Sequence, residues 1–485
     1  MENIVNIKLV DNMKIKIDTE DEEYISSMKE EFTRYVPGFQ FIPIYKSGIW
    51  SGKVCMIDKF HNTMPYGLLF DLIRIHKKNF PRNKLIIEPK IKKLFSGTRF
   101  RVTQDLSLKP YPYQKDCINS ALKHRKGIIR SATSSGKSLI ISYIIKTLLE
   151  KEKSGVTKAL IVVPNIQLVE QFYKDMIEYN MDKDMLGRVY QKYKEWDKDI
   201  VIATWQTLKN NHDKLVDYQC IICDETHSCR ALELKKILEK AVNCTYRLGF
   251  TGTMPPDDLD GWNVKGYLGP IIREYPSGFL AKKGYISKCN VKMLNVKYLQ
   301  EEWEGEYNDI KNEIFVKKYR YKIIEKLTNS LDHNLLILVG KVEMEGQYLE
   351  KELKKNCNKE IVFLSGRDDV EVREKWRNKC KDRKNLVIIA TYGIFAQGLN
   401  IPNLKYIMLA APFKSKIRVL QSIGRSLRKH TDKKEGATIF DIVDQTKFFE
   451  KYGLIRLRYY DSEGFNIDEY LLIEGEEINI EGLLK

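Results

Sequence analysis

The chain has 485 residues, of which 43% are hydrophobic and 30% carry a charge. This length predicts two or three domains, and the composition is typical of a soluble globular protein. No apolar run reaches about 18 residues and the N-terminus lacks a signal-peptide core, so we expect a cytoplasmic protein without a membrane span. The formal net charge of +17 predicts an anionic partner, with solubility alone as the simpler alternative.

Residues 1–97 are predicted to form a small α+β accessory domain. Strand-like runs at 4–10 and 13–17 precede a helical stretch at 21–34, and 39–57 read as a hairpin that turns near residue 47. The end of the region is basic, with candidate nucleic-acid contacts at Lys77, Lys78, Lys92 and Lys93. A solvated surface is the alternative interpretation of these lysines.

From about residue 108, short apolar strands alternate with helical stretches, as in an α/β protein with a parallel sheet. The pattern restarts near residue 335, so two sheet domains are predicted in tandem. We expect the first sheet domain at 98–275. The second sheet domain is expected at 276–460, together with a connector. This connector fills most of 265–333. A C-terminal tail is expected at 461–485.

The stretch SATSSGKS at 131–138 joins an apolar strand to an apolar helix. Backbone N–H groups at the start of such a helix can cradle phosphate oxygens. Ser134, Ser135 and Gly136 would form the loop, Lys137 would reach the β- and γ-phosphates, and Ser138 could place its hydroxyl on Mg²⁺. The strict motif has glycine where Ser131 and Ser134 stand, so an ordinary serine-rich turn remains the alternative.

The stretch CIICDETH at 220–227 ends a second apolar strand with two adjacent carboxylates. Asp224 could hold the Mg²⁺ shell together with Ser138, while Glu225 could orient and deprotonate a water for attack on the γ-phosphate. An acidic strand end alone means little. In this order after a GKS loop, however, it predicts a nucleoside triphosphate hydrolase.

Eight segments stand in the order of the motifs of superfamily 2 helicases, which the chain therefore resembles. They are LKPYPYQ, SATSSGKS, ALIVVPNIQLVEQ, IATWQTL, DETH, GFTGT, ATYGIFAQGLNIP and QSIGRSLR. The resemblance implies two RecA-like parallel-sheet domains behind the small α+β domain, with ATP and Mg²⁺ as cofactors. The resemblance also favours a phosphate loop over a serine-rich turn at 131–138, because this family tolerates small residues other than glycine at the start of the loop.

The resemblance assigns roles to particular residues. Gln114, with Tyr113 beside it, would read the adenine, and Arg425 and Arg428 look like the arginines that reach the γ-phosphate. Coupling of hydrolysis to nucleic-acid binding is implied for His227, Thr251, Thr253 and Gln421. Backbone contacts with nucleic acid are implied for Pro164, Gln167, Thr204, Gln206, Thr391 and Gly398.

The layout looks closest to the UvsW-type branched-DNA helicases of bacteriophages, which have a small basic N-terminal domain before two compact sheet domains. This resemblance implies ATP-driven 3′-to-5′ translocation on DNA and unwinding or branch migration of forks, Holliday junctions and D-loops in recombination and repair. RNA would be a partner in R-loops. We expect a monomer, in the host cytoplasm if the chain is phage-encoded.

Three alternatives stay open at the level of sequence. The motor could translocate on duplex DNA without separating the strands, or it could act on RNA. In a different class, the chain could be a nucleic-acid-binding scaffold with a degenerate ATPase, which only the missing loop glycines favour.

Overall fold

The computed structural model describes residues 3–103, 105–226, 231–254, 259–300, 302–397, 401, 404–411, 415, 419, 423–424 and 436–484. The chain divides into two compact units. Unit 1 comprises Met1–Ser131 and Gly136–Glu274, and unit 2 comprises Ala132–Ser135 and Tyr275–Lys485. Within the described part of the chain, no helix is long and apolar enough to cross a membrane.

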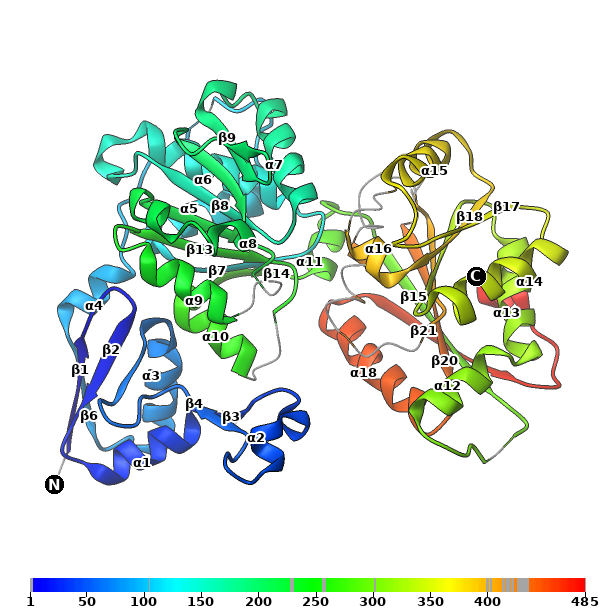
Figure 1. The fold of residues 1–485 in the computed structure, drawn as a ribbon, viewed down its shortest axis with the longest axis horizontal. Helices are drawn as coiled ribbons and strands as arrows, with labels where there is room; N and C mark the ends of the chain where they lie inside the picture. Colours follow the sequence, from blue (N-terminus) through cyan, green and yellow to red (C-terminus); the bar gives the residue numbers. More distant parts are fainter. Residues whose placement is uncertain are drawn as a thin grey trace. The chain divides into compact units, whose positions relative to one another are not determined.

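Unit 1 begins with a four-stranded mixed sheet in the order β5-β2-β1-β6 (Figure 1). β1 runs antiparallel to β2 and parallel to β6, and alternate residues such as Val5 and Ile7 are fully buried against helices α1 and α3. This alternation is that of a strand with one face on a core. The elements are β1 (Ile4–Leu9), β2 (Lys14–Asp18), α1 (Glu22–Glu31), β5 (Thr63–Pro65), α3 (Leu69–Asn79), β6 (Lys84–Ile87) and α4 (Pro89–Leu94).

Between α1 and β5 the chain forms an arm, residues 33–61, which differs from the predicted hairpin. Strands β3 (Thr33–Tyr35) and β4 (Lys53–Cys55) pair antiparallel, but the residues between them form a 3₁₀ turn and a short helix, α2 (Pro43–Lys46). The prediction of strands on both sides of residue 47 was therefore wrong for 39–46. Pro43 explains the difference, because it has no N–H for a strand ladder and its fixed φ suits the first turn of a helix.

The rest of unit 1 is an eight-stranded sheet in the order β10-β9-β11-β8-β12-β13-β7-β14. The pairs from β9 to β7 are all parallel. Its strands are β7 (Lys126–Ser131), β8 (Ala159–Val163), β9 (Leu186–Tyr190), β10 (Tyr193–Lys194), β11 (Ile200–Thr204), β12 (Cys220–Asp224), β13 (Tyr246–Thr251) and β14 (Ile271–Tyr275). Its helices are α5 (Pro112–His124), α6 (Lys137–Glu150), α7 (Ile166–Glu178), α8 (Trp205–Leu208), α9 (Ala231–Lys240) and α10 (Leu259–Leu268).

Helices α9 and α10 cover one face of this sheet and α5, α6 and α7 cover the other. The N-terminal domain continues the core on the α9–α10 side, because its Phe32 packs on Trp262 of α10 and its Tyr66 hydroxyl donates to Tyr267 O at 2.9 Å. Gly67 lies so close to α10 that an added Cβ would fall 2.0 Å from Lys265 O. The small domain and the first sheet therefore share one hydrophobic core.

Unit 2 holds a seven-stranded parallel sheet in the order β17-β18-β16-β19-β20-β15-β21. Its strands are β15 (Cys289–Lys297), β16 (Leu335–Val339), β17 (Glu360–Leu364), β18 (Leu386–Thr391), β19 (Tyr406–Leu409), β20 (Ala437–Asp444) and β21 (Asn466–Ile473). Its helices include α11 (Ser277–Lys282), α12 (Tyr307–Phe315), α13 (Lys318–Ser330), α14 (Tyr348–Asn356), α15 (Val370–Asp382), α16 (Tyr392–Gln397), α18 (Phe449–Ser462) and α19 (Ile480–Leu484). Two parallel sheets behind a small mixed sheet confirm the predicted fold class.

Candidate active site

The start of α6, with Lys137, and the acidic strand end meet at one edge of the first sheet. β7, which leads into the loop, and β12, which ends at Asp224, both pair with β13 in parallel. The register places Thr251 of β13 opposite Arg130 and Phe250 opposite Asp224. Because the carboxyl ends of parallel strands lie at the same edge, side chains from three separate motifs converge there.

Lys137 and Glu225 form an ion pair at this edge. Lys137 Nζ lies 3.3 Å from Glu225 Oε1, and the two side chains are 9% and 17% exposed. Burial lowers the pKa of Lys137, but the attraction of Glu225 and Asp224 outweighs it, so the net shift is upward. The lysine is therefore held as a cation where the motif needs a positive charge for phosphate.

Asp224 is buried, and burial together with the neighbouring charge of Glu225 raises its pKa. Its Oδ1 has no hydrogen-bond partner among the described residues. A buried carboxylate oxygen without a partner suits a divalent cation, which would neutralise the charge that burial penalises. Asp224 thus fits the chemistry of a Mg²⁺ ligand, and Ser138 as a second ligand stays a prediction.

The loop adopts left-handed backbone at two positions. Gly136 has φ +73°, and an added Cβ would lie 2.6 Å from Gln114 Nε2. Ser134 has φ +69°, a conformation that glycine adopts without strain and serine does not. A serine therefore occupies a position of this loop whose backbone conformation is suited to glycine.

Gln114 lies against this loop from α5. Its Oε1 accepts from the backbone N–H of Tyr111 at 2.9 Å, which caps the helix, and its side chain is buried. Tyr113 is also buried, with its ring stacked 6.2 Å from that of Tyr111. Contact of either residue with adenine stays a prediction.

Two threonines predicted to couple hydrolysis to nucleic-acid binding are buried in a turn after β13. Thr251 Oγ1 donates to Thr253 O at 2.7 Å and accepts from Thr253 N at 3.3 Å. Thr253 Oγ1 has no partner within the described ranges. The turn begins next to the strand that ends at Asp224, so it adjoins the acidic pair.

Four of the predicted nucleic-acid contacts lie at or just after the ends of β8 and β11, which are adjacent. Thr204 caps α8 by accepting from Thr207 N, and Gln206 Nε2 donates to Pro164 O at 3.2 Å. The side chains of Gln167 and Gln206 are exposed. These groups form a small polar edge without a charge of their own.

The other predicted residues are spread over both units or lie outside the described residues. Lys77 and Lys78 are exposed in the last turn of α3, and Lys92 and Lys93 are exposed in the last turn of α4. Thr391 ends β18 in unit 2. His227, Gly398, Gln421, Arg425 and Arg428 lie outside the described residues, so their roles stay predictions.

Three family models match successive parts of the chain. Residues 4–82 match "DNA helicase UvsW, N-terminal", residues 107–256 match "Type III restriction enzyme, res subunit", and residues 319–430 match "Helicase conserved C-terminal domain". The sequence is 27% identical to the ATP-dependent DNA helicase uvsW of Enterobacteria phage T4, with 95% of this chain and 98% of the relative covered. The chain is a superfamily 2 helicase related to UvsW.

More distant relatives agree with this assignment. The helicase is 24% identical to the DNA 3′-5′ translocase XPB2 of Sulfurisphaera tokodaii over 88% of this chain and 99% of the relative. Its fold matches a fragment of an HsdR subunit of a type I restriction enzyme from Vibrio vulnificus, with TM-score 0.54 and 17% identity over 76% and 70% of the two chains. The helicase is an ATP-dependent enzyme, which excludes the scaffold with a degenerate ATPase.

Sequence reasoning missed one residue beside the predicted nucleotide site of this helicase. The hydroxyl of Tyr179, which follows α7, lies 3.0 Å from Ser138 Oγ, the predicted cation ligand. Tyr179 therefore orients the hydroxyl of the phosphate loop. No motif contains it, and a tyrosine after an amphipathic helix carries no signal that points to the loop.

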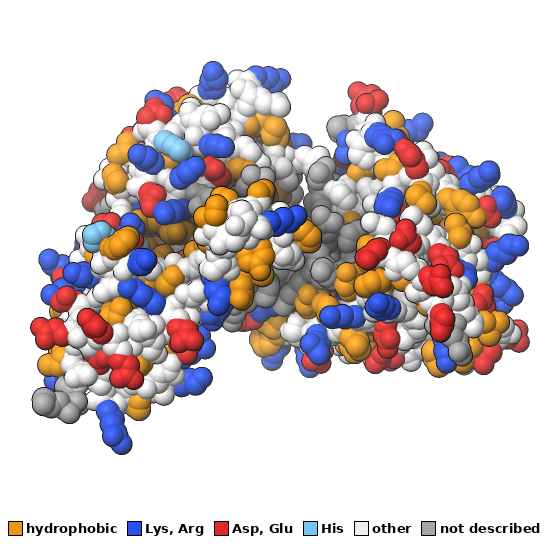
Figure 2. Space-filling view, turned by 60° about the horizontal axis from the view of Figure 1, so that its bottom comes forward, with side chains coloured by type: hydrophobic (Ala, Val, Ile, Leu, Met, Phe, Trp, Pro, Cys, Tyr) orange, Lys and Arg blue, Asp and Glu red, His pale blue; other side chains and the backbone are white. Residues whose placement is uncertain are grey.

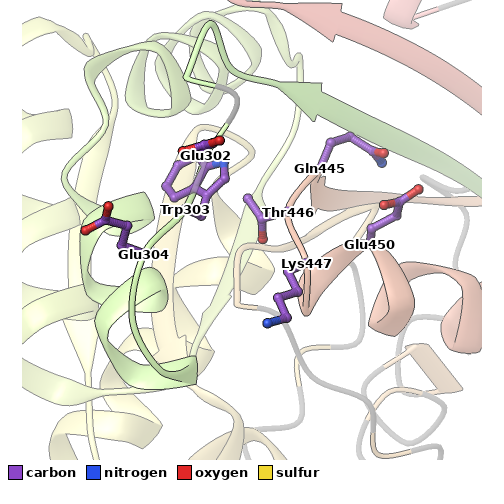
Figure 3. Close-up of a pocket in the computed structure, with 7 residues that line it drawn as sticks. All are labelled: Glu302, Trp303, Glu304, Gln445, Thr446, Lys447 and Glu450. Atoms are coloured by element: carbon purple, nitrogen blue, oxygen red, sulfur yellow. The ribbon is translucent and has the colours of Figure 1, made fainter.

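Unit 2 of the helicase contains a cavity of about 430 Å³ between residues 302–304 and the start of α18 (Figure 3). It holds none of the predicted site residues, and its lining consists of Glu302, Trp303, Glu304, Gln445, Thr446, Lys447 and Glu450. The lining contains three carboxylates and a single lysine. This charge is unfavourable for phosphate groups, so the cavity offers no alternative to the predicted nucleotide site.

Proposed function

We propose that the helicase acts on DNA, translocates 3′-to-5′, and unwinds or branch-migrates forks, Holliday junctions, D-loops and R-loops in recombination and repair. The observation that carries this proposal is the match to the phage T4 helicase over 95% of this chain. The match to the UvsW N-terminal model over residues 4–82 adds support, because it includes the domain outside the motor. A DNA partner also accounts for the net charge of +17.

ATP hydrolysis at the sheet edge would use residues that already lie together. Lys137 would bind the γ-phosphate, and this ligand would replace Glu225 as its partner. Glu225, thereby released from the ion pair, would accept a proton from the attacking water. Mg²⁺, held by Asp224 and Ser138, would supply charge neutralisation for the phosphates.

Strand separation on defined substrates tests the proposal. Partial duplexes with a 3′ or a 5′ single-stranded extension, a replication fork and a four-way junction would be incubated with ATP and resolved on native gels. Unwinding of the 3′-extended duplex and of the branched substrates is expected. The proposal would be contradicted if only the 5′-extended duplex were unwound, or if no branched substrate were unwound.

A second candidate function is translocation on duplex DNA without strand separation. The XPB2 relative and the restriction-subunit model over residues 107–256 favour it. Displacement of a third strand from a triplex, with no unwinding of forks or junctions, would identify this activity.

A further inference from the structure

The arm of the N-terminal domain, residues 33–61, exposes large hydrophobic side chains. Phe41 is 73% exposed, and Ile49 and Phe60 are each 81% exposed. Between Pro37 and Ser51 no side chain is buried. Isolated exposed hydrophobic residues are ordinary, but several on one short projecting segment mark a binding surface.

The arm is ordered by a few contacts at its base. Phe39 stacks on Tyr35 with ring centroids 4.6 Å apart and meets Tyr45 edge-on at 4.7 Å. Gly52 makes room for Phe39, since an added Cβ would lie 2.4 Å from that ring. Arg34 lies over the ring of Trp262 at 4.1 Å, which fixes the arm to α10 of the first sheet domain. Phe41 is not needed for any of these contacts.

The arm is also basic. It carries Arg34, Lys46, Lys53 and Lys59 against one acid, Asp58. The Asp58 carboxylate accepts from the backbone N–H groups of Phe60 and His61, so it is already used in a turn. In Figure 2 the arm comes forward, and hydrophobic and basic side chains cover it. Its charge is complementary to a phosphate backbone.

Lysines accompany the aromatic rings at two places. Lys53 Nζ lies 4.9 Å from the ring centre of Tyr35, and Lys59 Nζ lies 5.8 Å from that of Phe60. Exposed rings next to cations are the elements with which proteins hold single-stranded nucleic acid, since every base has a face for stacking and every nucleotide a phosphate. A paired duplex hides its base faces and offers only the phosphates.

We propose that the arm binds unpaired nucleotides at a strand junction, with bases stacked on Phe41 and the lysines on the flanking phosphates. This inference rests on the proposed function and deepens it, because it gives the N-terminal domain a means to distinguish open from paired DNA. The chemistry required of the ligand is an unstacked base next to a phosphate.

Fluorescence anisotropy with the full-length chain tests this inference. Dissociation constants would be measured for a fork with single-stranded arms and for a blunt duplex of equal length, at one salt concentration. Phe41→Ala should weaken fork binding about tenfold and blunt-duplex binding much less. Phe41→Leu should weaken fork binding as much as Phe41→Ala does, because the proposed contact requires an aromatic face and not only apolar volume. Phe41→Trp should therefore retain fork binding.

Leu299→Ala is the matched control, because Leu299 is 70% exposed and lies in unit 2. It should leave both dissociation constants unchanged. Unfolding temperatures should stay at the wild-type value in all four variants, since the substituted side chains are exposed. Phe60→Ala provides a second position if Phe41→Ala lowers the unfolding temperature.

The outcomes separate this inference from the proposed function. Wild-type affinity for the fork in Phe41→Ala and Phe60→Ala would overturn the inference and leave the helicase proposal standing. Retained fork binding in Phe41→Leu would also overturn the inference. If the wild-type chain self-associates in sedimentation and Phe41→Ala does not, the arm is a contact between two copies and the inference is overturned as well. A wild-type chain that binds neither substrate would remove the proposed function itself.

Discussion

The phosphate loop shows how a sequence can depart from a motif and keep its geometry. Ser134 adopts φ +69°, where a non-glycine residue costs about 1 kcal/mol. Ser134→Gly should therefore keep ATP hydrolysis and raise the unfolding temperature slightly. Ser134→Val should lower hydrolysis at least tenfold, because a β-branched residue fits this conformation poorly. Steady-state turnover of the two variants measures this, and equal activity of both would mean that the loop path is unimportant.

Glu225 is the residue on which the chemical step depends. Glu225→Gln keeps the size of the side chain and removes the base, so hydrolysis should fall by about 10²–10⁴-fold while ATP binding persists. A fluorescent ATP analogue measures binding, and phosphate release measures turnover. Lys137→Ala is the contrasting variant, because it should weaken nucleotide binding as well. Undiminished turnover in Glu225→Gln would remove Glu225 from the catalytic role.

At the level of elements, β20 carries two carboxylates in buried ion pairs, Asp441 with Arg456 and Asp444 with Arg320. Arg456 makes a bidentate pair with Asp441, at 2.7 and 2.8 Å, and Tyr460 donates to the same carboxylate at 2.7 Å. Arg456→Met would leave a buried charge without its partner and should cost about 3–5 kcal/mol. Arg377→Met, which breaks the more exposed pair with Glu374, should cost less than about 1 kcal/mol. Calorimetry on the full chain compares the stability of the two variants. Equal losses of stability would contradict the larger role given to the buried pair.

The first strand of the motor domain, β7, begins with a buried lysine. Burial lowers the pKa of Lys126 to about 7, with the nearby charge of Arg247 as a second cause. Between pH 7 and about 10.4 the unfolded chain therefore binds a proton that the folded chain does not, so stability should rise with pH across this window. Lys126→Met should raise stability at pH 7 by a few kcal/mol, on the order expected for such a shift. Unfolding temperatures of the wild type and of Lys126→Met at pH 7 and pH 10 measure this dependence of stability on pH. The same rise with pH in both proteins would exclude Lys126 as the cause.

The parts of the fold that sequence predicted are those with a strong local signal. Short apolar strands such as those at 159–163 and 335–339 identified both sheets, and the chain order of the GKS loop and the acidic strand end predicted one shared site for Lys137, Asp224 and Glu225. β15 escaped prediction because its pattern, CNVKMLNVK, mixes polar residues into a strand that lies between β20 and β21. The segment from Asn466 to Ile473, expected in a tail, pairs with β15 as β21. The contact between Tyr179 and Ser138 depends on tertiary packing, which no local pattern encodes.

At the scale of the molecule, the N-terminal domain cannot be removed without exposing the core that it shares with the first sheet domain. A charge variant is therefore a better test of its role than a deletion. Changing Lys77, Lys78, Lys92 and Lys93 to Ala should reduce the slope of log affinity for DNA against log salt concentration by up to about 3–4. The same change at Lys322, Lys351, Lys354 and Lys355, exposed in unit 2, is the control. Equal slopes in the two variants would leave the N-terminal lysines without a specific role in binding.

The most direct test of a branched-DNA helicase is the stimulation of its ATPase. Steady-state hydrolysis by the purified protein would be measured at one salt concentration with no nucleic acid, single-stranded DNA, linear duplex DNA, a synthetic four-way junction and RNA. The strongest stimulation is expected from the junction or from single-stranded DNA. Stimulation by linear duplex alone, by RNA alone or by none of them would contradict the proposed function.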